Sequence, residues 1–388
     1  MKSCLFHFFA FSLSFCTFSQ NCPPKAESSH SFSPSKASFS EENLHRLKLP
    51  SGFSINVFAS NICGARMIKS TPNGIFFVSC PKEGKVIALK DTTGDGKADI
   101  VQAAIEGLPD VHGIAIVSDT IFLAAPNIVW KARIEGYSIK NPVAIIKDLP
   151  PGGRHSRRTL GIGPDGLLYI SIGSSCNACI EKDSNYATIE KVDLDGTNRR
   201  TFARGLRNTL GFDWSPQTGQ FWGMDQGSDD RGDTIPPEEL NLLIEGKNYG
   251  WPFVYGKRCP DPIMKYSSQN EQHFILSTEP AVLTYTAHSS PIGFVFYKGT
   301  RFPQYYLNGA IVTFRGSWNR TPPSGYKVAF VKYENGRPQK FEDFITGFLS
   351  SNNTSQFARV TGITVATDGS ILFCDDENGM VYRVDYKK

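Results

Sequence analysis

A polar turn followed by an apolar strand recurs six times along this chain. In each copy, residues that favour turns precede a run of β-branched and aromatic residues, which is the pattern of a β-hairpin. The clearest copy is GPDGLLYIS, from Gly163 to Ser171. The turns of the six copies are centred on Gly74, Asp119, Gly166, Gly219, Gly309 and Gly369.

The spacing of these turns predicts the fold. Successive turns are 45, 47, 53, 90 and 60 residues apart. A period of roughly 40–50 residues, with one such strand in each unit, is typical of a β-propeller. We therefore predict an all-β, six-bladed β-propeller, with an insertion between blades 4 and 5 at about 252–278. A β-sandwich or two separate β domains is the alternative, but no helical or linker-like pattern interrupts residues 47–386.

The N-terminus has a different pattern. Residues 1–19 combine Lys2, an apolar stretch and small polar residues, which predicts a signal peptide, with an uncleaved anchor as the alternative. Residues 20–46 are rich in Ser and Pro and predict a disordered lead-in. The propeller then occupies 47–388. We expect the protein to be exported, to the periplasm or outside the cell, without stable membrane insertion after cleavage.

Composition excludes several classes of protein. Of the 388 residues, 40% are hydrophobic, which is too many for a disordered chain. The 41 basic and 37 acidic residues are evenly spread, whereas a nucleic-acid binder concentrates its basic residues in a patch. No run of about 18 apolar residues follows the N-terminus, so we expect no membrane-spanning helix in the remainder.

Cysteine spacing predicts one disulfide. The chain has nine cysteines, and signal cleavage would remove Cys4 and Cys16. Export permits disulfides, and Cys176 and Cys179 are close enough in sequence to pair. A metal site or a redox motif is the alternative for this pair, but no second C-x-x-C and no nearby His cluster support zinc. The odd number that remains leaves at least one thiol unpaired.

Several polar clusters lie just before the predicted strands. His155 lies on a Gly-flanked loop and is a candidate general base, although a basic surface loop would have the same composition. Arg207 and Asn208 precede an apolar strand and offer a cation and an amide to an anionic ligand. The loop 224–233 is rich in carboxylates and Gly, which suits either a hard cation or a simple acidic turn.

The other blades carry comparable residues. Each blade has a His or an Arg near an equivalent place, which indicates a channel mouth that is lined by cationic groups and suits a polyanionic ligand. These further candidates are His112, His288, Arg315 and Arg359. Residues 91–99 have a spacing similar to an EF-hand loop, but Thr93 and Gln102 replace expected acidic ligands, so an inter-strand turn is favoured.

Taken together, these motifs resemble those of a known family. They are GARM at 64–67, RHSRR at 154–158, SSCN at 174–177, GLRN at 205–208, PPEELN at 236–241, NYGWP at 248–252 and GSWNR at 316–320. The chain is similar, over nearly all of 47–386, to the soluble PQQ-dependent glucose/sorbosone dehydrogenases, and to their L-sorbosone dehydrogenase-like branch in particular.

This resemblance implies a function. The family's propeller holds pyrroloquinoline quinone (PQQ) and Ca²⁺ over the channel mouth and oxidises a sugar or sugar aldehyde, passing electrons to an acceptor. By resemblance, His155 is the general base, and Arg207 and Asn208 polarise the reacting oxygen. Backbone ligands of Ca²⁺ map to Gly227 and Ser228. The resemblance assigns the cofactor contacts to Arg66, Arg207, Asn208, Arg315 and Arg359, and the substrate pocket to His112 and His288.

Two positions depart from the family pattern. Ser174 stands where glucose-oxidising relatives carry Asp, and Arg315 stands where His is common in this branch. Two other functions stay open on a propeller of this kind: a Ca²⁺-dependent sugar lactonase, and a non-catalytic module that binds a glycan or a protein. A lactonase would need carboxylate and amide ligands converging on a metal and would not need several arginines.

Overall fold

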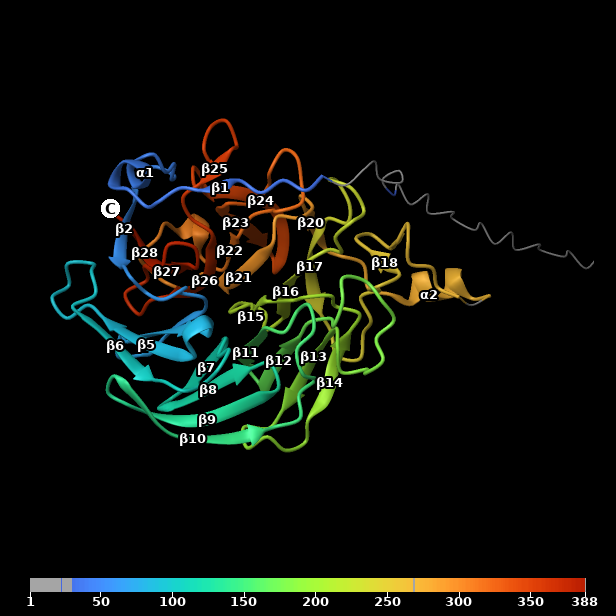
Figure 1. Ribbon diagram of the computed structural model, residues 1–388, viewed down its shortest axis with the longest axis horizontal. Coiled ribbons are helices and arrows are strands. Elements are labelled where there is room, and N and C mark those ends of the chain that lie inside the picture. The colour runs from blue at the N-terminus through green and yellow to red at the C-terminus, as the bar shows by residue number, and fades with distance from the viewer. Residues whose placement is uncertain (1–21, 23–29, 268, 388) are drawn as a thin grey trace, which may run out of the picture.

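Each of the six turns expected from the sequence joins the first and second strands of a four-stranded antiparallel sheet. The structure is a computed structural model that describes residue 22 and residues 30–267 and 269–387. The six sheets are arranged around a common axis as the blades of a propeller (Figure 1). The predicted all-β, six-bladed fold is therefore confirmed.

The first three blades follow one another along the chain, and their strands pair in sequence order. The first blade contains β3 (Ile68–Ser70), β4 (Phe76–Cys80), β5 (Lys85–Lys90) and β6 (Ile100–Ile105). The second contains β7 (Gly113–Val117), β8 (Thr120–Ala125), β9 (Ile128–Glu135) and β10 (Ser138–Ile146). The third contains β11 (Arg158–Ile162), β12 (Leu168–Ile172), β13 (Thr188–Val192) and β14 (Arg200–Arg204).

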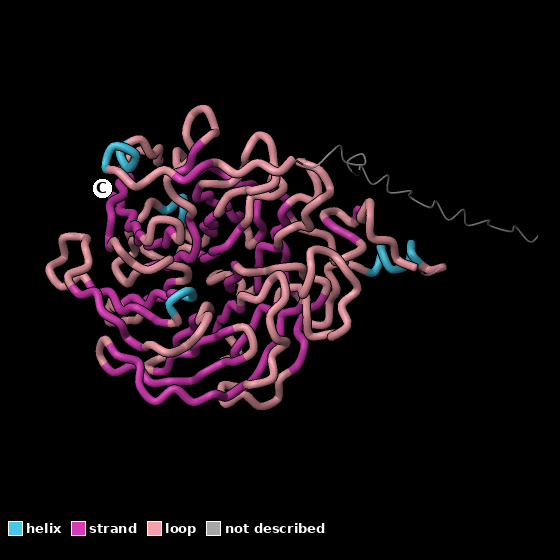
Figure 2. Tube along the Cα trace, in the orientation of Figure 1, coloured by secondary structure: helices cyan, strands magenta, loops and turns pink. Residues whose placement is uncertain are grey.

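The other three blades are less regular in sequence. The fourth contains β15 (Gly211–Trp214), β16 (Phe221–Asp225), β17 (Glu238–Leu243) and β20 (Leu283–Tyr285). The fifth contains β21 (Pro291–Phe296), β22 (Ala310–Phe314), β23 (Lys327–Glu334) and β24 (Arg337–Ile345). The sixth combines β26 (Val360–Val365), β27 (Ile371–Asp375) and β28 (Met380–Tyr386) with β2 (Phe53–Ala59), which precedes the first blade in the chain. Short 3₁₀ helices, η1 (Pro81–Glu83) and η2 (Gln304–Tyr306), lie in two of the connecting loops (Figure 2).

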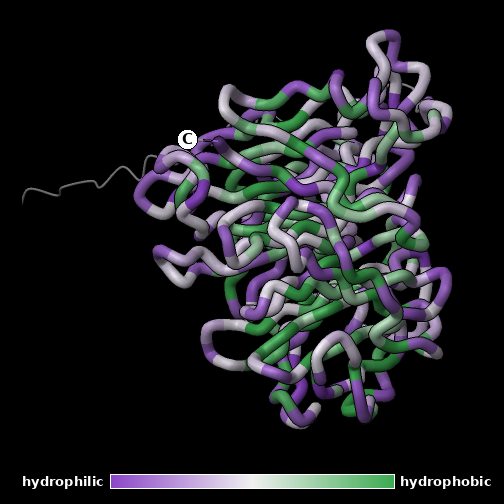
Figure 3. The backbone as a smooth tube through the Cα atoms, turned by 90° about the vertical axis from the view of Figure 1, so that its left-hand side faces the viewer, coloured by the Kyte–Doolittle hydropathy of each residue, from purple (hydrophilic) through white to green (hydrophobic). Residues whose placement is uncertain are grey.

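The hydrophobic core is divided among the blade interfaces. Successive residues of a strand point to opposite faces of its sheet, so a blade that is covered on both sides needs strands that are apolar throughout. β12 and β27 are buried along their whole length. Within the described residues, six main clusters of buried side chains occur, one between each pair of neighbouring blades. In Figure 3 the hydrophobic stretches lie mainly inside the molecule, and the projecting loops are mostly hydrophilic.

The long spacing between the fourth and fifth turns has a different origin from the one predicted. β17 pairs with β20, so residues 244–282 are an excursion inside the fourth blade, between its third and fourth strands. The excursion contains β18 (Val254–Tyr255), β19 (Cys259–Pro260) and the helix α2 (Glu271–Ser277), and its outer part projects from the ring in Figure 1. The prediction of an insertion between blades 4 and 5, in a chain without a helical segment, was wrong because β20 is short and has no turn signal.

The described part of the predicted lead-in is packed against the propeller rather than disordered. β1 (Ser35–Lys36) pairs in parallel with β25 (Ser355–Gln356), and a short helix, α1 (Glu41–His45), follows it. Leu44 is buried in the cluster between the fifth and sixth blades. A few apolar side chains are therefore enough to dock residues 30–46, in spite of their polar composition.

Two disulfides are formed among the described cysteines. Cys176 pairs with Cys179, as predicted, and Cys22 pairs with Cys259, which links the N-terminal segment to the excursion of the fourth blade. Cys63, Cys80 and Cys374 remain as thiols. The predicted signal peptide, residues 1–19, lies outside the described residues. In the part that is described, no helix is both long enough and apolar enough to cross a membrane.

Candidate functional site

A histidine or an arginine lies shortly before the first strand of every blade. The first strands contact one another around the axis, and each begins at the same end of the ring. The residues that precede them therefore meet at one end of the central channel. They are Arg66 before β3, His112 before β7, His155 before β11, Arg207 before β15, His288 before β21 and Arg359 before β26.

Four arginines, which we call the arginine cluster, lie around the carboxylate of Asp376. Arg66 donates to Asp376 over 2.6 Å, and Arg315 donates over 3.0 Å. Arg157 and Arg359 are close enough to interact electrostatically with the same carboxylate. Asp110 also faces Arg157 at 3.6 Å, and Glu377 lies near Arg359. Three carboxylates therefore neutralise part of the charge of the four guanidinium groups and leave a small positive excess.

The arginine cluster stays charged at neutral pH. Burial, assisted by the charges of Arg315 and Arg157, lowers the pKa of Arg66 to about 10, and Asp376 opposes this shift. Burial alone would raise the pKa of Asp376, but Arg66 and Arg315 together bring it below its usual value. The positive excess therefore persists across the physiological range of pH.

His112 supports the arginine cluster instead of facing the channel. Its side chain is fully buried, Nδ1–H donates to the carbonyl of Arg158 over 2.8 Å, and Nε2 faces Nε of Arg66 at 3.4 Å. Burial and the charge of Arg66 lower the pKa of His112 well below its ordinary value, so the ring is neutral. The prediction that His112 lines a substrate pocket is not supported, because both ring nitrogens already have protein partners.

His155 lies on the opposite side of the mouth with one ring nitrogen engaged. Nδ1 lies 2.8 Å from Oγ of Ser174, and that hydroxyl donates to the carbonyl of Cys176 over 2.7 Å. Since the hydroxyl proton is directed to Cys176, Nδ1 is the protonated nitrogen of the ring and Nε2 keeps its lone pair. Burial, followed by the charge of Arg207, lowers the pKa of His155 to about 3.

Arg207 and Asn208 are held firmly beside it. Arg207 is 3% exposed and donates to the backbone carbonyl and the side-chain oxygen of Asn177, over 2.8 and 2.9 Å. Nδ2 of Asn208 donates to Oε1 of Gln226, whose own amide donates to the carbonyl of Pro291. This series of hydrogen bonds orients the side-chain amides of Asn208 and Gln226. It leaves Oδ1 of Asn208 buried without a hydrogen-bond partner among the described residues.

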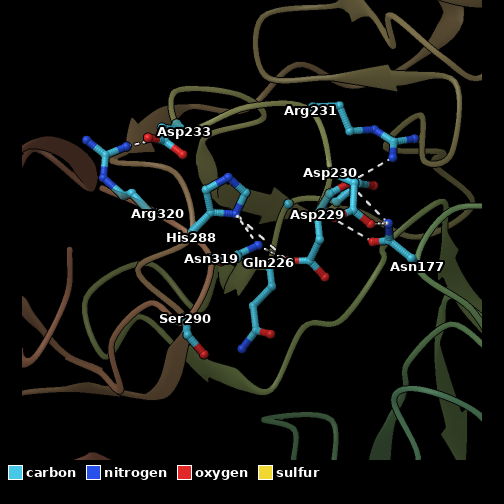
Figure 4. Close-up of polar contacts among 12 residues, drawn as sticks. Asn177, Gln226, Asp229, Asp230, Arg231, Asp233, His288, Ser290, Asn319 and Arg320 are labelled. Atoms are coloured by element: carbon cyan, nitrogen blue, oxygen red, sulfur yellow. Dashed lines mark hydrogen bonds and ion pairs between the residues drawn. The ribbon is translucent and has the colours of Figure 1, made fainter. Parts of the chain in front are cut away.

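Asp229 connects these residues to the fifth blade (Figure 4). Its carboxylate accepts hydrogen bonds from Arg207 at 2.9 Å, from Arg154 at 3.0 Å and from Asn319 at 2.8 Å. Nδ1 of His288 lies 3.8 Å from the same carboxylate, while Nε2–H of His288 donates to a backbone carbonyl. His288 therefore lines the site with a largely buried side chain, and both of its ring nitrogens have protein partners.

Gly227 and Ser228 turn away from β16 between these groups. The N–H of Gly227 donates to Glu238 over 3.0 Å, and Oγ of Ser228 accepts from the indole N–H of Trp251 at 3.2 Å. A side chain at position 227 would lie 2.9 Å from the carbonyl oxygen of Pro236, so the backbone is closely packed there. Among the described residues, neither carbonyl oxygen of this pair accepts a hydrogen bond. Both remain available to a cation.

The loop 91–99 lies apart from this site. Asp91 accepts hydrogen bonds from the N–H groups of Gly94 and Gly96, and Asp99 accepts from those of Thr92 and Thr93. This is the arrangement of a tight turn between β5 and β6, the interpretation favoured from the sequence.

Sequence reasoning missed four residues that organise the site. They are Asn177, Asp229, Asn319 and Asp376, and each lies beside a candidate that the sequence had identified. Asp229 lies inside the carboxylate-rich loop, so composition placed it near a site without giving its partners. Asp376 follows β27 with no motif of its own, and only the three-dimensional structure shows that it holds two arginines.

Comparisons with known proteins agree with this fold. The TrAA12-like family model matches residues 47–387. An uncharacterized protein of Borreliella burgdorferi is 29% identical over 365 residues, which covers 90% of this chain and 93% of that protein. An AA12 carbohydrate-active enzyme of Trichoderma reesei has a similar structure, with a TM-score of 0.77 and 19% identity over 88% of this chain and 97% of the other. The PQQ domain of a pyranose dehydrogenase from Coprinopsis cinerea has a TM-score of 0.74 and 18% identity, over 87% of this chain and 97% of that domain.

Proposed function

Because the chain belongs to the TrAA12-like family, we propose that it is a sugar oxidoreductase that binds PQQ and Ca²⁺ at the mouth of the channel. The observation that carries this proposal is the arginine cluster, in which four guanidinium groups lie around the carboxylate of Asp376. PQQ has three carboxylates, and guanidinium groups bind carboxylates with strong, directional hydrogen bonds. In this proposal Arg66, Arg315 and Arg359 bind the cofactor.

The side chains around the mouth fit a bound ligand. Oδ1 of Asn208 is buried without a partner, and an unsatisfied buried acceptor destabilises a protein by about 1–3 kcal/mol. We infer that a ligand N–H or O–H completes this hydrogen bond. The carbonyl oxygens of Gly227 and Ser228 are ligands that Ca²⁺ accepts, because it prefers oxygen donors.

His155 acts as the general base in this proposal. Bound PQQ supplies the two-electron acceptor that no side chain offers, and Ca²⁺ a Lewis acid. Because Nδ1–H is donated to Ser174, Nε2 of His155 is free to take the proton from the C1 hydroxyl of a sugar or from an aldehyde hydrate. Arg207 lies beside the ring, and its charge stabilises the negative charge that develops on the substrate oxygen. Asn208 presents its acceptor Oδ1 to the site and would orient the substrate or cofactor by accepting a hydrogen bond from it.

The proposal is tested by titrating the purified protein with PQQ, with and without Ca²⁺, and following the heat and the quinone absorbance. We expect tight binding that needs Ca²⁺, and reduction of a soluble dye acceptor when an aldose or an aldosone is added. No binding in the presence of Ca²⁺ rules out a quinoprotein and leaves a sugar lactonase or a glycan- or protein-binding propeller. The panel of sugars then identifies the substrate and tests the sorbosone-like branch.

One variant separates catalysis from binding. His155→Ala should keep PQQ binding, because the arginines hold the cofactor, and should lower turnover by roughly 10²- to 10⁴-fold. His273 lies exposed on α2, so His273→Ala is the matched control and should leave turnover unchanged. Turnover of His155→Ala near the wild-type rate would assign the base to another group.

A further inference from the structure

Cys176 and Cys179 close a four-residue loop that lies between His155 and Arg207. In the proposed reaction, His155 takes the proton and Arg207 stabilises the negative charge. Cys176 contacts the His155 side through its carbonyl oxygen, which accepts the hydroxyl proton of Ser174 at 2.7 Å. Asn177 contacts Arg207 on the other side with both its backbone and its side-chain oxygen. The disulfide therefore closes a short loop that begins at Cys176, the partner of Ser174, and contains Asn177, the partner of Arg207.

The carbonyl of Cys176 determines which nitrogen of His155 carries the proton. A serine hydroxyl both donates and accepts, so Ser174 alone is compatible with either tautomer of a neighbouring ring. With its proton directed to Cys176, Oγ of Ser174 only accepts, and Nδ1 of His155 must be the donor. The lone pair then lies on Nε2, the nitrogen that the proposed mechanism needs.

Asn177 fixes the orientation of Arg207 by accepting two hydrogen bonds from its guanidinium group. Its two oxygens accept from Nε and NH2 of Arg207, and its Oδ1 also accepts from the N–H of Asp229. Its own amide donates to the carbonyl of Asp229 over 3.1 Å. On the far side of the loop, Glu181 accepts from the N–H and the hydroxyl of Ser175, over 2.7 and 2.6 Å. The loop is thus anchored on both flanks.

We propose that the Cys176–Cys179 disulfide is a positioning device that fixes the tautomer of His155 and the orientation of Arg207. This inference rests on the proposed function, in which these two residues act on the sugar. Without the bond, the peptide planes of 176–179 gain conformational freedom, and the carbonyl of Cys176 no longer holds a single direction. Ser174 is then free to donate to Nδ1, and the Nε2–H tautomer becomes populated.

The bond is accessible to a reductant. Cys176 and Cys179 are half-buried, and a small dithiol can reach a half-buried disulfide by thiolate attack. Reduction breaks the S–S bond, takes two electrons and two protons from the dithiol to give two cysteine thiols, and leaves the dithiol as its own disulfide. In the other disulfide, Cys22–Cys259, Cys259 is buried, so a dithiol reaches that bond less readily.

The test uses the full chain with Cys176→Ser and Cys179→Ser together. The matched control is Cys22→Ser with Cys259→Ser, which removes the disulfide that does not contact His155 or Arg207. The first readout is the ¹⁵N chemical shift of the His155 imidazole in the protein without PQQ, which distinguishes the two tautomers. We expect Nδ1–H in the wild type and the control, and a mixture of tautomers in the Cys176/Cys179 variant.

The second readout is turnover. We expect kcat of the Cys176/Cys179 variant to fall by roughly 10- to 100-fold, as small misplacements of catalytic groups do, with PQQ affinity unchanged. The acid limb of the pH profile should move upward as the ring gains solvent. The charges that face His155, namely Arg207, Arg154 and Asp229, are retained in the variant. The control should match the wild type in kcat and in the position of the acid limb.

Ser174→Ala keeps the test decisive if the cysteine variant folds poorly. It removes the hydroxyl relay and leaves the disulfide intact, so it should mix the tautomers of His155 in the same way. An unchanged Nδ1–H tautomer in both variants overturns the positioning role. A wild type that binds no PQQ defeats the proposed function instead, and the tautomer measurement on the cofactor-free protein still decides the role of the disulfide.

Discussion

Gly173, the residue that follows β12, leaves the space in which His155 and Asn208 approach one another. A Cβ atom at this position would lie 2.5 Å from Cβ of His155 and 2.8 Å from Oδ1 of Asn208. The two residues come from loops of different blades, and no side chain separates them at the strand end. Any larger residue here would have to displace one of the two.

The pH dependence of stability reports the environment of His155. Its folded-state pKa is lowered to about 3, chiefly by burial, against an ordinary value of 6.5. The unfolded chain therefore binds the proton more readily, so this contribution to stability is complete above pH 6.5 and is lost as the pH falls toward 3. Relative to His155→Gln, we expect the wild-type free energy of unfolding to fall by about 1.4 kcal/mol per pH unit below pH 6.5. Urea unfolding at several pH values measures this, and a constant difference would contradict a buried neutral ring.

Arg315 tests the assignment of the arginine cluster. If it binds a carboxylate of PQQ, Arg315→Ala should weaken cofactor binding by about 1.5–3 kcal/mol, the size of a charged hydrogen bond. Turnover at saturating PQQ should change much less. Arg301, which pairs with Asp385 near the opposite end of the channel, is the control, and Arg301→Ala should leave the affinity unchanged in calorimetry. Equal affinity in both variants would place Arg315 outside the cofactor site.

At the scale of residues, the sequence revealed the types of side chain at the mouth and concealed their orientation. His155, Arg207 and Asn208 were predicted from the strand starts, and the structure brings them together. His112 has the same position in its blade, but its ring points to Arg158 and Arg66. Nothing in the local sequence distinguishes the two histidines, because the difference depends on a neighbouring blade.

At the scale of elements, the predictable strands are those that carry a turn signal. The first two strands of five of the blades are joined by a short turn whose Gly or Asp residues are visible in the sequence, and in the fifth blade a longer loop with η2 joins them. β20, the fourth strand of the fourth blade, has no such marker and pairs with β17 through only three residues. The excursion 244–282 was therefore placed near the correct blade but on the wrong side of its last strand.

The closure of the ring depends on β2, and Phe53 at its start is the residue that tests this. Its ring lies 4.7 to 5.1 Å from the rings of Phe302, Tyr306, Phe344 and Tyr386. Phe53→Ala removes these contacts and should lower the free energy of unfolding by about 3 kcal/mol. Val143 is exposed on β10, so Val143→Ala should change it by less than about 0.5 kcal/mol. Equal denaturation midpoints for the two variants would show that β2 does not stabilise the sixth blade.

At the scale of the whole molecule, the number of blades followed from the six turns, most of which are 45 to 60 residues apart. The identity of the strand that closes the ring did not follow, because β2 precedes the first repeat and nothing in its local pattern indicates that its partner is β28. Pairing between β2 and β28 joins segments more than 300 residues apart. Local patterns contain no information on a contact of that range.

The proposed cofactor should stabilise the entire ring. The three arginines that would bind the cofactor, Arg66, Arg315 and Arg359, come from the first, fifth and sixth blades, so one ligand would connect three of the six sheets. PQQ with Ca²⁺ at 100 times the dissociation constant should raise the free energy of unfolding by about 2.7 kcal/mol. Calorimetric melting measures the shift, and addition of a Ca²⁺ chelator should reverse it. A melting temperature that does not respond to the ligand would mean that the folded state does not bind it.

The pairing of β2 with β28 also has a consequence for biosynthesis. β28 follows every other strand of the ring in the chain, and β2 has no other partner in its sheet. The ribosome must therefore synthesise all six blades before the ring can close. Until then the nascent chain exposes the apolar flank of its first blade, where β2, β27 and β28 later pack. Closure must wait for the synthesis of β28, and a chaperone that covers this flank would act in the interval between synthesis of the first blade and that of the last strand.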